Sequence, residues 1–95
     1  MDSLNELRVT GKMRWLGAAD AWLAEADEVV RALASDGFEE CKHEEARDRR
    51  HRSRNGVWQG LNHATGGVAS AVWVGSDYRD QLVFIDIDGE PVRDG

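Results

Sequence analysis

Cysteine and proline are almost missing from this chain of 95 residues, which has one of each, Cys41 and Pro91. A single cysteine excludes an intramolecular disulfide, so the core alone has to stabilise the fold. A lone thiol is also more typical of the reducing cytoplasm than of a secreted protein. Pro91 cannot donate a backbone hydrogen bond, and it therefore fits only an edge strand or a tail.

Long hydrophobic runs are also missing. The longest stretch without Asp, Glu, Lys or Arg is 55–76, and it contains five glycines and several polar residues. This stretch is too polar for a membrane-spanning helix. The first residues, MDSLNELR, contain no apolar segment of the kind found in signal peptides. We therefore expect a protein of the cytoplasm with no membrane partner.

What is present is typical of one small globular domain, which we place over residues 1–95. Hydrophobic residues make up 41% of the chain and charged residues 32%, a balance that favours a folded rather than a disordered protein. A chain of this length buries roughly two-thirds of its unfolded surface. The net charge of −6 favours solubility and disfavours casual binding of nucleic acid.

The clearest periodic pattern predicts a long amphipathic helix over residues 12–35. Its apolar positions recur every three or four residues and are Leu16, Ala19, Leu23, Ala26, Val30 and Leu33. Thr10 is suited to cap the start of this helix. Gly37 is suited to the left-handed residue that follows the end of a helix. Residues 1–10 form a lead-in, for which both an ordered and a flexible state remain open.

The second half of the chain changes to the two-residue period of strands. Alternating apolar residues predict strands over 68–74 and 82–87, and a third candidate lies over 57–62. Short turns join them, at Gly66-Gly67 and within 76–80, and Asp88-Gly89 is a further turn signal. Consecutive short strands with short turns predict an antiparallel meander.

Residues 38–54 are ambiguous, because a helix there would have almost no apolar face. We favour an edge strand over 38–45, since edge strands tolerate dense charge, followed by an Arg-rich turn over 46–55. The predicted fold class is therefore α+β. It has one long N-terminal helix packed on a three- to four-stranded antiparallel sheet.

The Arg-rich segment is the most unusual feature of the charge pattern. Residues 39–54 contain six basic and five acidic residues, so this segment has a net charge of +1 in an acidic chain. Three interpretations remain open: a solvated hairpin that neutralises itself, a phosphate-binding surface, and a handle that docks on an acidic protein patch. For phosphate binding, Arg contacts would be joined by a base stacked on Trp58.

The four tryptophans suggest a binding surface. If Val57, Val72 and Ile85 face the helix, the two-residue period places their neighbours on the opposite side of the sheet. Those neighbours are Trp58, Trp73 and Phe84. A single helix covers one face of a sheet, so the other face would expose aromatic anchors. The alternative is inverted facing, with the aromatics in the core and the valines outside.

Signals for catalysis or for a metal are weak. Cys41, His43, His51 and His63 do not have the spacing of a structural zinc site. The segment Asp86-x-Asp88-Gly89-Glu90 lacks the further ligands of a calcium loop. We therefore expect no cofactor, no metal and no enzymatic activity.

The leading hypothesis is a small acidic, non-enzymatic module that binds a protein. Such proteins are often phage or mobile-element inhibitors of a host protein or defence system, which is an association and not a derivation. The expected partner is a protein with a basic surface, and a homodimer is a further option. The binding residues would be Trp58, Trp73, Phe84, Arg49, Arg50, Arg52 and Arg54. The alternative is a nucleic-acid-binding module that uses residues 47–54.

Overall fold

The computed structural model describes residues 3–76, 79–88 and 90–91, which form an antiparallel sheet and two short helices. The helices are α1 (Leu4–Val9) and α2 (Ala26–Ser35). The strands are β1 (Met13–Trp15), β2 (Ala21–Ala24), β3 (Glu39–Asp48), β4 (Ser53–Leu61), β5 (Val68–Val74), β6 (Gln81–Ile87) and β7 (Glu90–Pro91).

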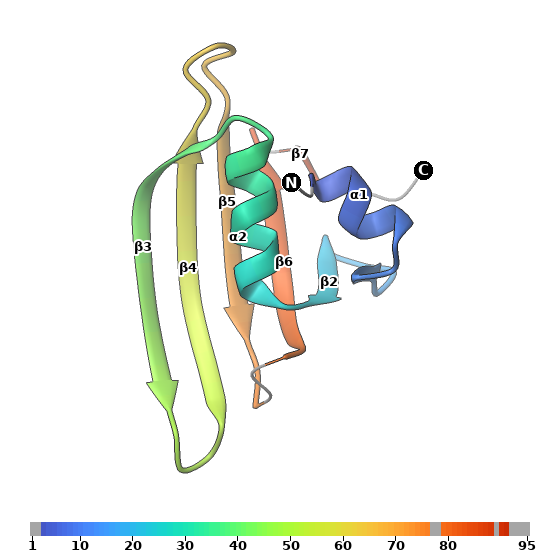
Figure 1. The fold of residues 1–95 in the computed structure, drawn as a ribbon, viewed down its shortest axis with the longest axis vertical. Helices are drawn as coiled ribbons and strands as arrows, with labels where there is room; N and C mark the ends of the chain where they lie inside the picture. Colours follow the sequence, from blue (N-terminus) through green and yellow to red (C-terminus); the bar gives the residue numbers. More distant parts are fainter. Residues whose placement is uncertain (1–2, 77–78, 89, 92–95) are drawn as a thin grey trace.

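The sheet order is β1-β2-β6-β5-β4-β3, and the two-residue β7 also pairs with β6. Strands β3 to β6 form a meander, whereas β2 pairs with the first half of β6. Helix α2 carries the chain from β2 across one face of the sheet to β3 at the opposite edge, and α1 lies beside α2 (Figure 1). The helices therefore cover one face of the sheet, and neither of them covers the opposite face.

The predicted long helix over 12–35 and the three- to four-stranded sheet are wrong. Within the predicted range of 12–35, only residues 26–35 are helical. Residues 13–24 form the β1–β2 hairpin of a seven-stranded sheet. The chain turns at Gly17, Ala19 and Asp20, whose φ angles of 92°, 54° and 54° are left-handed. Pairing of β2 with β6 therefore overrides the helical period of the apolar residues in this segment.

Other predictions for the first half have mixed outcomes. Residues 4–9 of the lead-in form α1, which Ser3 caps by accepting a hydrogen bond from the Glu6 backbone. Thr10 ends this helix and does not start another. The predicted helix end is confirmed, because Asp36 is the C-cap of α2 and Gly37 follows with φ of 105°.

The strand predictions for the second half are largely confirmed. Strand β5 covers 68–74, β6 covers 81–87, and β4 includes most of 57–62. The edge strand predicted over 38–45 is β3, but it continues to Asp48, so the turn at its end spans only 49–52 and not 46–55. Pro91 lies in β7, which pairs only with β6. Part of the predicted 76–80 loop and Gly89 lie outside the described residues.

The core lies between α2 and the face of the sheet that we call the inner face. Helix α2 contributes Val29, Ala32 and Leu33, all fully buried. The sheet contributes two large indoles, Trp58 and Trp73, surrounded by small residues of the same face, which are Gly56, Gly60, Ala69 and Ala71. Small residues beside each indole leave room for the helix to approach the sheet.

The β1–β2 turn holds two non-glycine residues, Ala19 and Asp20, in the left-handed region, which costs an L-residue roughly 1 kcal/mol. We expect Ala19→Gly to raise the free energy of unfolding by about 0.5 kcal/mol, because the greater chain entropy of glycine offsets part of the relieved strain. Urea unfolding of this variant and of the control Ala18→Gly measures the difference. The control lies outside the left-handed region, and we expect it to be destabilised. Destabilisation of both variants to the same extent would contradict the assigned turn.

Candidate functional site

The face of the sheet opposite α2, which we call the outer face, carries apolar side chains from several neighbouring strands. Cross-strand pairing aligns Val57, Val72 and Phe84 in one row, and a second row pairs Val74 with Leu82. The apolar members of the outer face include Val57, Leu61, Val68, Val72, Val74, Leu82 and Phe84, together with Ala21 and Leu23 of β2.

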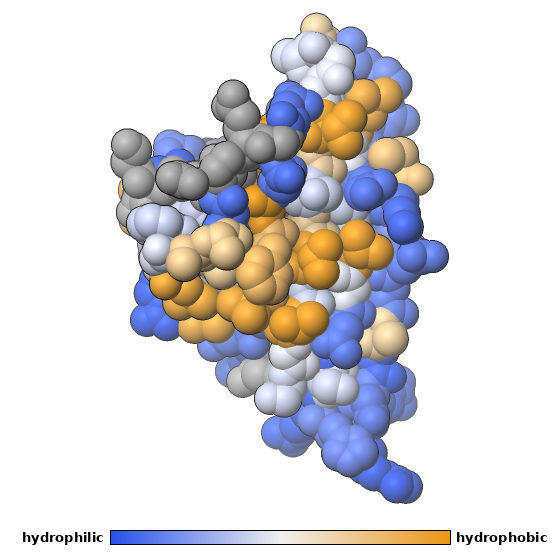
Figure 2. All heavy atoms as spheres, turned by 180° about the vertical axis from the view of Figure 1, so that it is seen from behind, coloured by the Kyte–Doolittle hydropathy of each residue, from blue (hydrophilic) through white to orange (hydrophobic). Residues whose placement is uncertain are grey.

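These side chains are accessible to solvent. Val68, Val72, Val74 and Phe84 are between 37% and 47% exposed. Figure 2 shows this side of the molecule, where hydrophobic side chains gather over the sheet and hydrophilic ones cover the projecting end of the β3–β4 hairpin. Exposed apolar patches of this kind mark interaction sites in soluble proteins.

The predicted facing of the aromatic residues is wrong for two of the three. Trp58 is 1% exposed and Trp73 is fully buried, both beneath α2. Phe84 does lie on the outer face, but together with Val57 and Val72. The inverted facing of the tryptophans is therefore the correct alternative. The error arose because the helix was placed on the face of the valines, whereas it packs on the face of the tryptophans. A separate error grouped Ile85 with Val72, which pairs with Phe84.

A hollow of about 320 Å³ opens on the outer face where the β1–β2 turn lies against β5 and β6. The Asp20 carbonyl accepts a 3.3 Å hydrogen bond from the Ile85 backbone, which holds this turn beside β6. The lining residues are Ala19, Asp20, Ser70, Val72, Phe84, Ile85 and Asp86. Among the described residues, the lining of the hollow therefore includes two acids and one aromatic residue and no basic residue.

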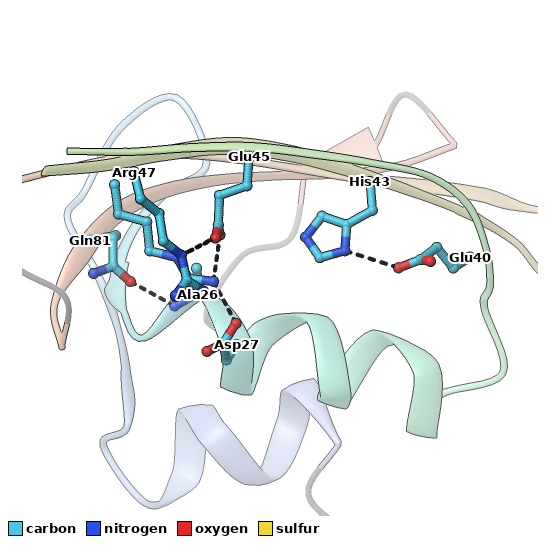
Figure 3. Close-up of polar contacts among 8 residues, drawn as sticks. Ala26, Asp27, Glu40, His43, Glu45, Arg47 and Gln81 are labelled. Atoms are coloured by element: carbon cyan, nitrogen blue, oxygen red, sulfur yellow. Dashed lines mark hydrogen bonds and ion pairs between the residues drawn. The ribbon is translucent and has the colours of Figure 1, made fainter. Parts of the chain in front are cut away.

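A charged cluster lies on the inner face, at the start of α2 (Figure 3). Arg54 is only 3% exposed, and its guanidinium donates to Glu45 and to Asp27 at 2.5 Å each. Its Cζ also lies 5.8 Å from the ring centroid of Trp73. Arg47 donates to the second oxygen of Glu45. Arg54 was predicted to bind a partner, but all of these contacts are internal, so its position indicates a structural role.

The same cluster shifts the pKa values of its acids. Hydrogen bonding from Arg54, followed by the charge of that residue, lowers the pKa of the Asp27 carboxyl despite some burial. Burial raises the pKa of Glu45, but the hydrogen bonds from Arg47 and Arg54 together outweigh it, so the net pKa is lowered. The pKa of Asp48 is lowered mainly by its hydrogen bond with the His51 side chain.

These lowered pKa values predict a loss of stability in acid. A carboxyl whose pKa is lower in the folded state stabilises the protein above its unfolded pKa, and this contribution is lost as the pH falls through the folded value. The free energy of unfolding should therefore change little from about pH 7 to 5 and fall below about pH 4. Urea unfolding across this range measures it. In the Glu45→Gln variant, the free energy of unfolding should fall less steeply at acid pH. An equally steep fall in this variant would contradict the role assigned to the lowered pKa of Glu45.

The turn between β3 and β4 presents the remaining predicted arginines. Arg49, Arg50 and Arg52 are exposed there, and Arg52 adopts a left-handed φ of 53°. The Asp48 carboxylate accepts hydrogen bonds from the backbones of Arg50 and His51, at 3.0 and 3.3 Å, and so shapes the turn. Trp58, expected to stack on a base beside them, is buried and donates its Nε1–H to Glu40 at 2.8 Å.

The cysteine and histidines do not gather into one site. Cys41 is exposed at an irregularity in the pairing of β3 with β4. Each histidine pairs with a different carboxylate, His43 with Glu40, His51 with Asp48, and His63 with Glu39. Among the described residues, no group of three or more His, Cys, Asp or Glu side chains is arranged to hold a metal ion.

The sequence indicated outward-facing valines only as an alternative, and it did not bring Asp20 and Asp86 together at one hollow. In the described ranges, no helix has the length and apolar character needed to cross a membrane. Comparison with protein-family models, with curated proteins and with solved structures finds no match for this chain. The geometry of the outer face is therefore the main indication of function.

Proposed function

We propose that this chain is a small, non-enzymatic module that binds a protein partner through its outer face and acts by occupying the partner's surface. The observation that supports this most is the apolar row Val57–Val72–Phe84, in which Val72 and Phe84 are exposed and Val57 is half-buried, on a face that neither helix covers. Burial of such apolar side chains against a partner would remove them from water, which favours association. The exposed Cys41 thiol is consistent with a cytoplasmic location.

Charge favours a basic partner over a second copy of the chain. The net charge is −6, so the chain has an excess of acidic side chains, including the exposed Asp86 on the outer face. Two copies joined face to face would bring these like charges together, which opposes association. A partner with basic residues around an apolar centre would instead be attracted and oriented by them.

The nucleic-acid alternative has lost part of its support. Trp58 is buried, so a base cannot stack on it. The Arg54 guanidinium is bound to Asp27 in the interior, so it is not available to contact a phosphate. Arg49, Arg50 and Arg52 remain exposed at the hairpin turn, but no aromatic platform among the described residues of that turn accompanies them. Binding to protein is therefore the one function we propose.

Site-specific photo-cross-linking tests the proposal. A chain with benzoylphenylalanine at Val74 on the outer face is expressed in the source cells, and a second chain carries it at Arg31, an exposed residue of α2. We expect one discrete protein adduct from position 74, lost when Val72→Asp is added, and none from position 31. Equal adducts from both positions, an adduct insensitive to Val72→Asp, or no adduct from either would overturn the proposal. An adduct with a second copy of the chain would replace the basic partner by a homodimer.

A further inference from the structure

The hollow on the outer face has features that select one kind of side chain. Phe84 forms part of its wall, and Asp86 lies two residues further along β6 on the same side of the sheet. Asp20 approaches from the β1–β2 turn. The hollow is thus lined by residues of the β1–β2 turn, β5 and β6, among them the exposed acid Asp86 and the aromatic residue Phe84.

Asp86 is available for an external contact. Its side chain is exposed, and within residues 3–76, 79–88 and 90–91 no hydrogen bond or ion pair engages its carboxylate. The outer-face acid Glu44, in contrast, already lies 3.7 Å from Lys42 Nζ. The carboxylate of Asp86 is therefore a more open acceptor for a cation of a partner than that of Glu44.

The chemistry of the lining favours arginine. A guanidinium can donate two parallel hydrogen bonds to a carboxylate. It can also lie over an aromatic face, here that of Phe84. The methylene groups of the side chain would lie along Val72, which keeps them away from water. A metal ion fits less well, because the described residues offer no group of three or more His, Cys, Asp or Glu side chains here, and most metal ions require several ligands from the protein.

From this arrangement we propose that the hollow receives an arginine side chain of the partner protein, held by the Asp86 carboxylate over Phe84. This inference rests on the proposed function and deepens it, because it names the residue of the partner that anchors the complex. The charge complementarity of an acidic hollow on an acidic protein supports a basic occupant.

Amide NMR titration with N-acetyl-arginine methylamide tests the hollow without a known partner. The probe should shift the amides of Ser70, Phe84 and Asp86, and the matching citrulline derivative, which has no charge, should shift them at least threefold less. Asp86→Asn should weaken the arginine response by threefold or more. Glu44→Gln, a change of the same kind on the same face but outside the hollow, should leave it unchanged. Unperturbed amide spectra of both variants establish that they are folded.

Three outcomes would overturn the inference: equal shifts with citrulline, an unchanged response in Asp86→Asn, or shifts that centre on the acids of β3. These results are distinguishable from failure of the proposed function. If position 74 cross-links to a partner and Asp86→Asn leaves both cross-linking and the arginine response intact, the outer face binds a protein but the arginine anchor is wrong. If the arginine response is as expected but position 74 gives no adduct, the proposed function fails.

Discussion

Replacement of Arg54 by methionine should lower the free energy of unfolding by about 3 kcal/mol. The substitution leaves the Glu45 carboxylate on the inner face of the sheet without its buried partner. Glu45 is 16% exposed at its side chain, so water replaces the lost contact poorly. Asp27 is more exposed and is expected to contribute less to the loss. Urea unfolding followed by far-UV circular dichroism measures the change.

Two further variants separate a charge effect from a packing effect at this cluster. Arg47→Met removes the other cation that contacts Glu45, but Arg47 is largely exposed, so we expect a loss below about 1 kcal/mol. The double variant Arg54→Met/Glu45→Leu removes both buried charges and should recover most of the stability that Arg54→Met loses. A double variant that is no more stable than Arg54→Met would show that the arginine acts through packing alone.

Gly56→Ala should lower the free energy of unfolding by about 2–3 kcal/mol through overpacking. An added Cβ at Gly56 would lie 2.4 Å from Cζ2 of Trp73 and 2.8 Å from the backbone oxygen of Glu44. Neither group can move freely, because the indole is packed beneath α2 and the oxygen belongs to the neighbouring strand. The measurement is again the urea midpoint of the purified variant.

Gly75→Ala is the matched control for this prediction. Its added Cβ would come no closer than 3.3 Å to Gln81 Cα, so the expected loss is below about 1 kcal/mol. Combining Gly56→Ala with Trp73→Phe should also give a smaller total loss than the sum of the single losses, because phenylalanine lacks the ring atoms that clash. Additive losses would contradict the assigned contact between Gly56 and Trp73.

The strands of the meander were predictable because their two-residue pattern is set within each strand. Which residues of neighbouring strands share a face was not predictable. Alternation along one strand does not determine its register with the next strand. Val72 pairs with Phe84 and not with Ile85, and this register depends on the loop between β5 and β6. One usable signal was overlooked: Gly56 and Gly60 flank Trp58 at two-residue spacing, and small residues beside a large one indicate a face packed under a helix.

The N-terminal half was harder to predict for a different reason. The apolar spacing of residues 12–24 fits a helix, but Trp22 pairs with Val83 and Leu23 with Leu82 in the sheet. Pairing with a strand that is distant in sequence overrides the local hydrophobic period, and it cannot be detected from a short stretch of sequence. Gly17, left-handed in the structure, was the local sign against a continuous helix. The buried role of Arg54 was equally hidden, since Asp27 and Glu45 are distant from it in sequence.

The central claim is that the outer face exposes Phe84 and valines while Trp58 and Trp73 are enclosed. Hydroxyl-radical footprinting with mass spectrometry tests it directly, because one experiment compares all four tryptophans with Phe84. We predict rapid oxidation of Phe84 and of Trp15, which is 38% exposed, and protection of Trp58 and Trp73. Oxidation of Trp58 and Trp73 at the rate of Trp15, with Phe84 protected, would contradict the account and restore an aromatic binding face.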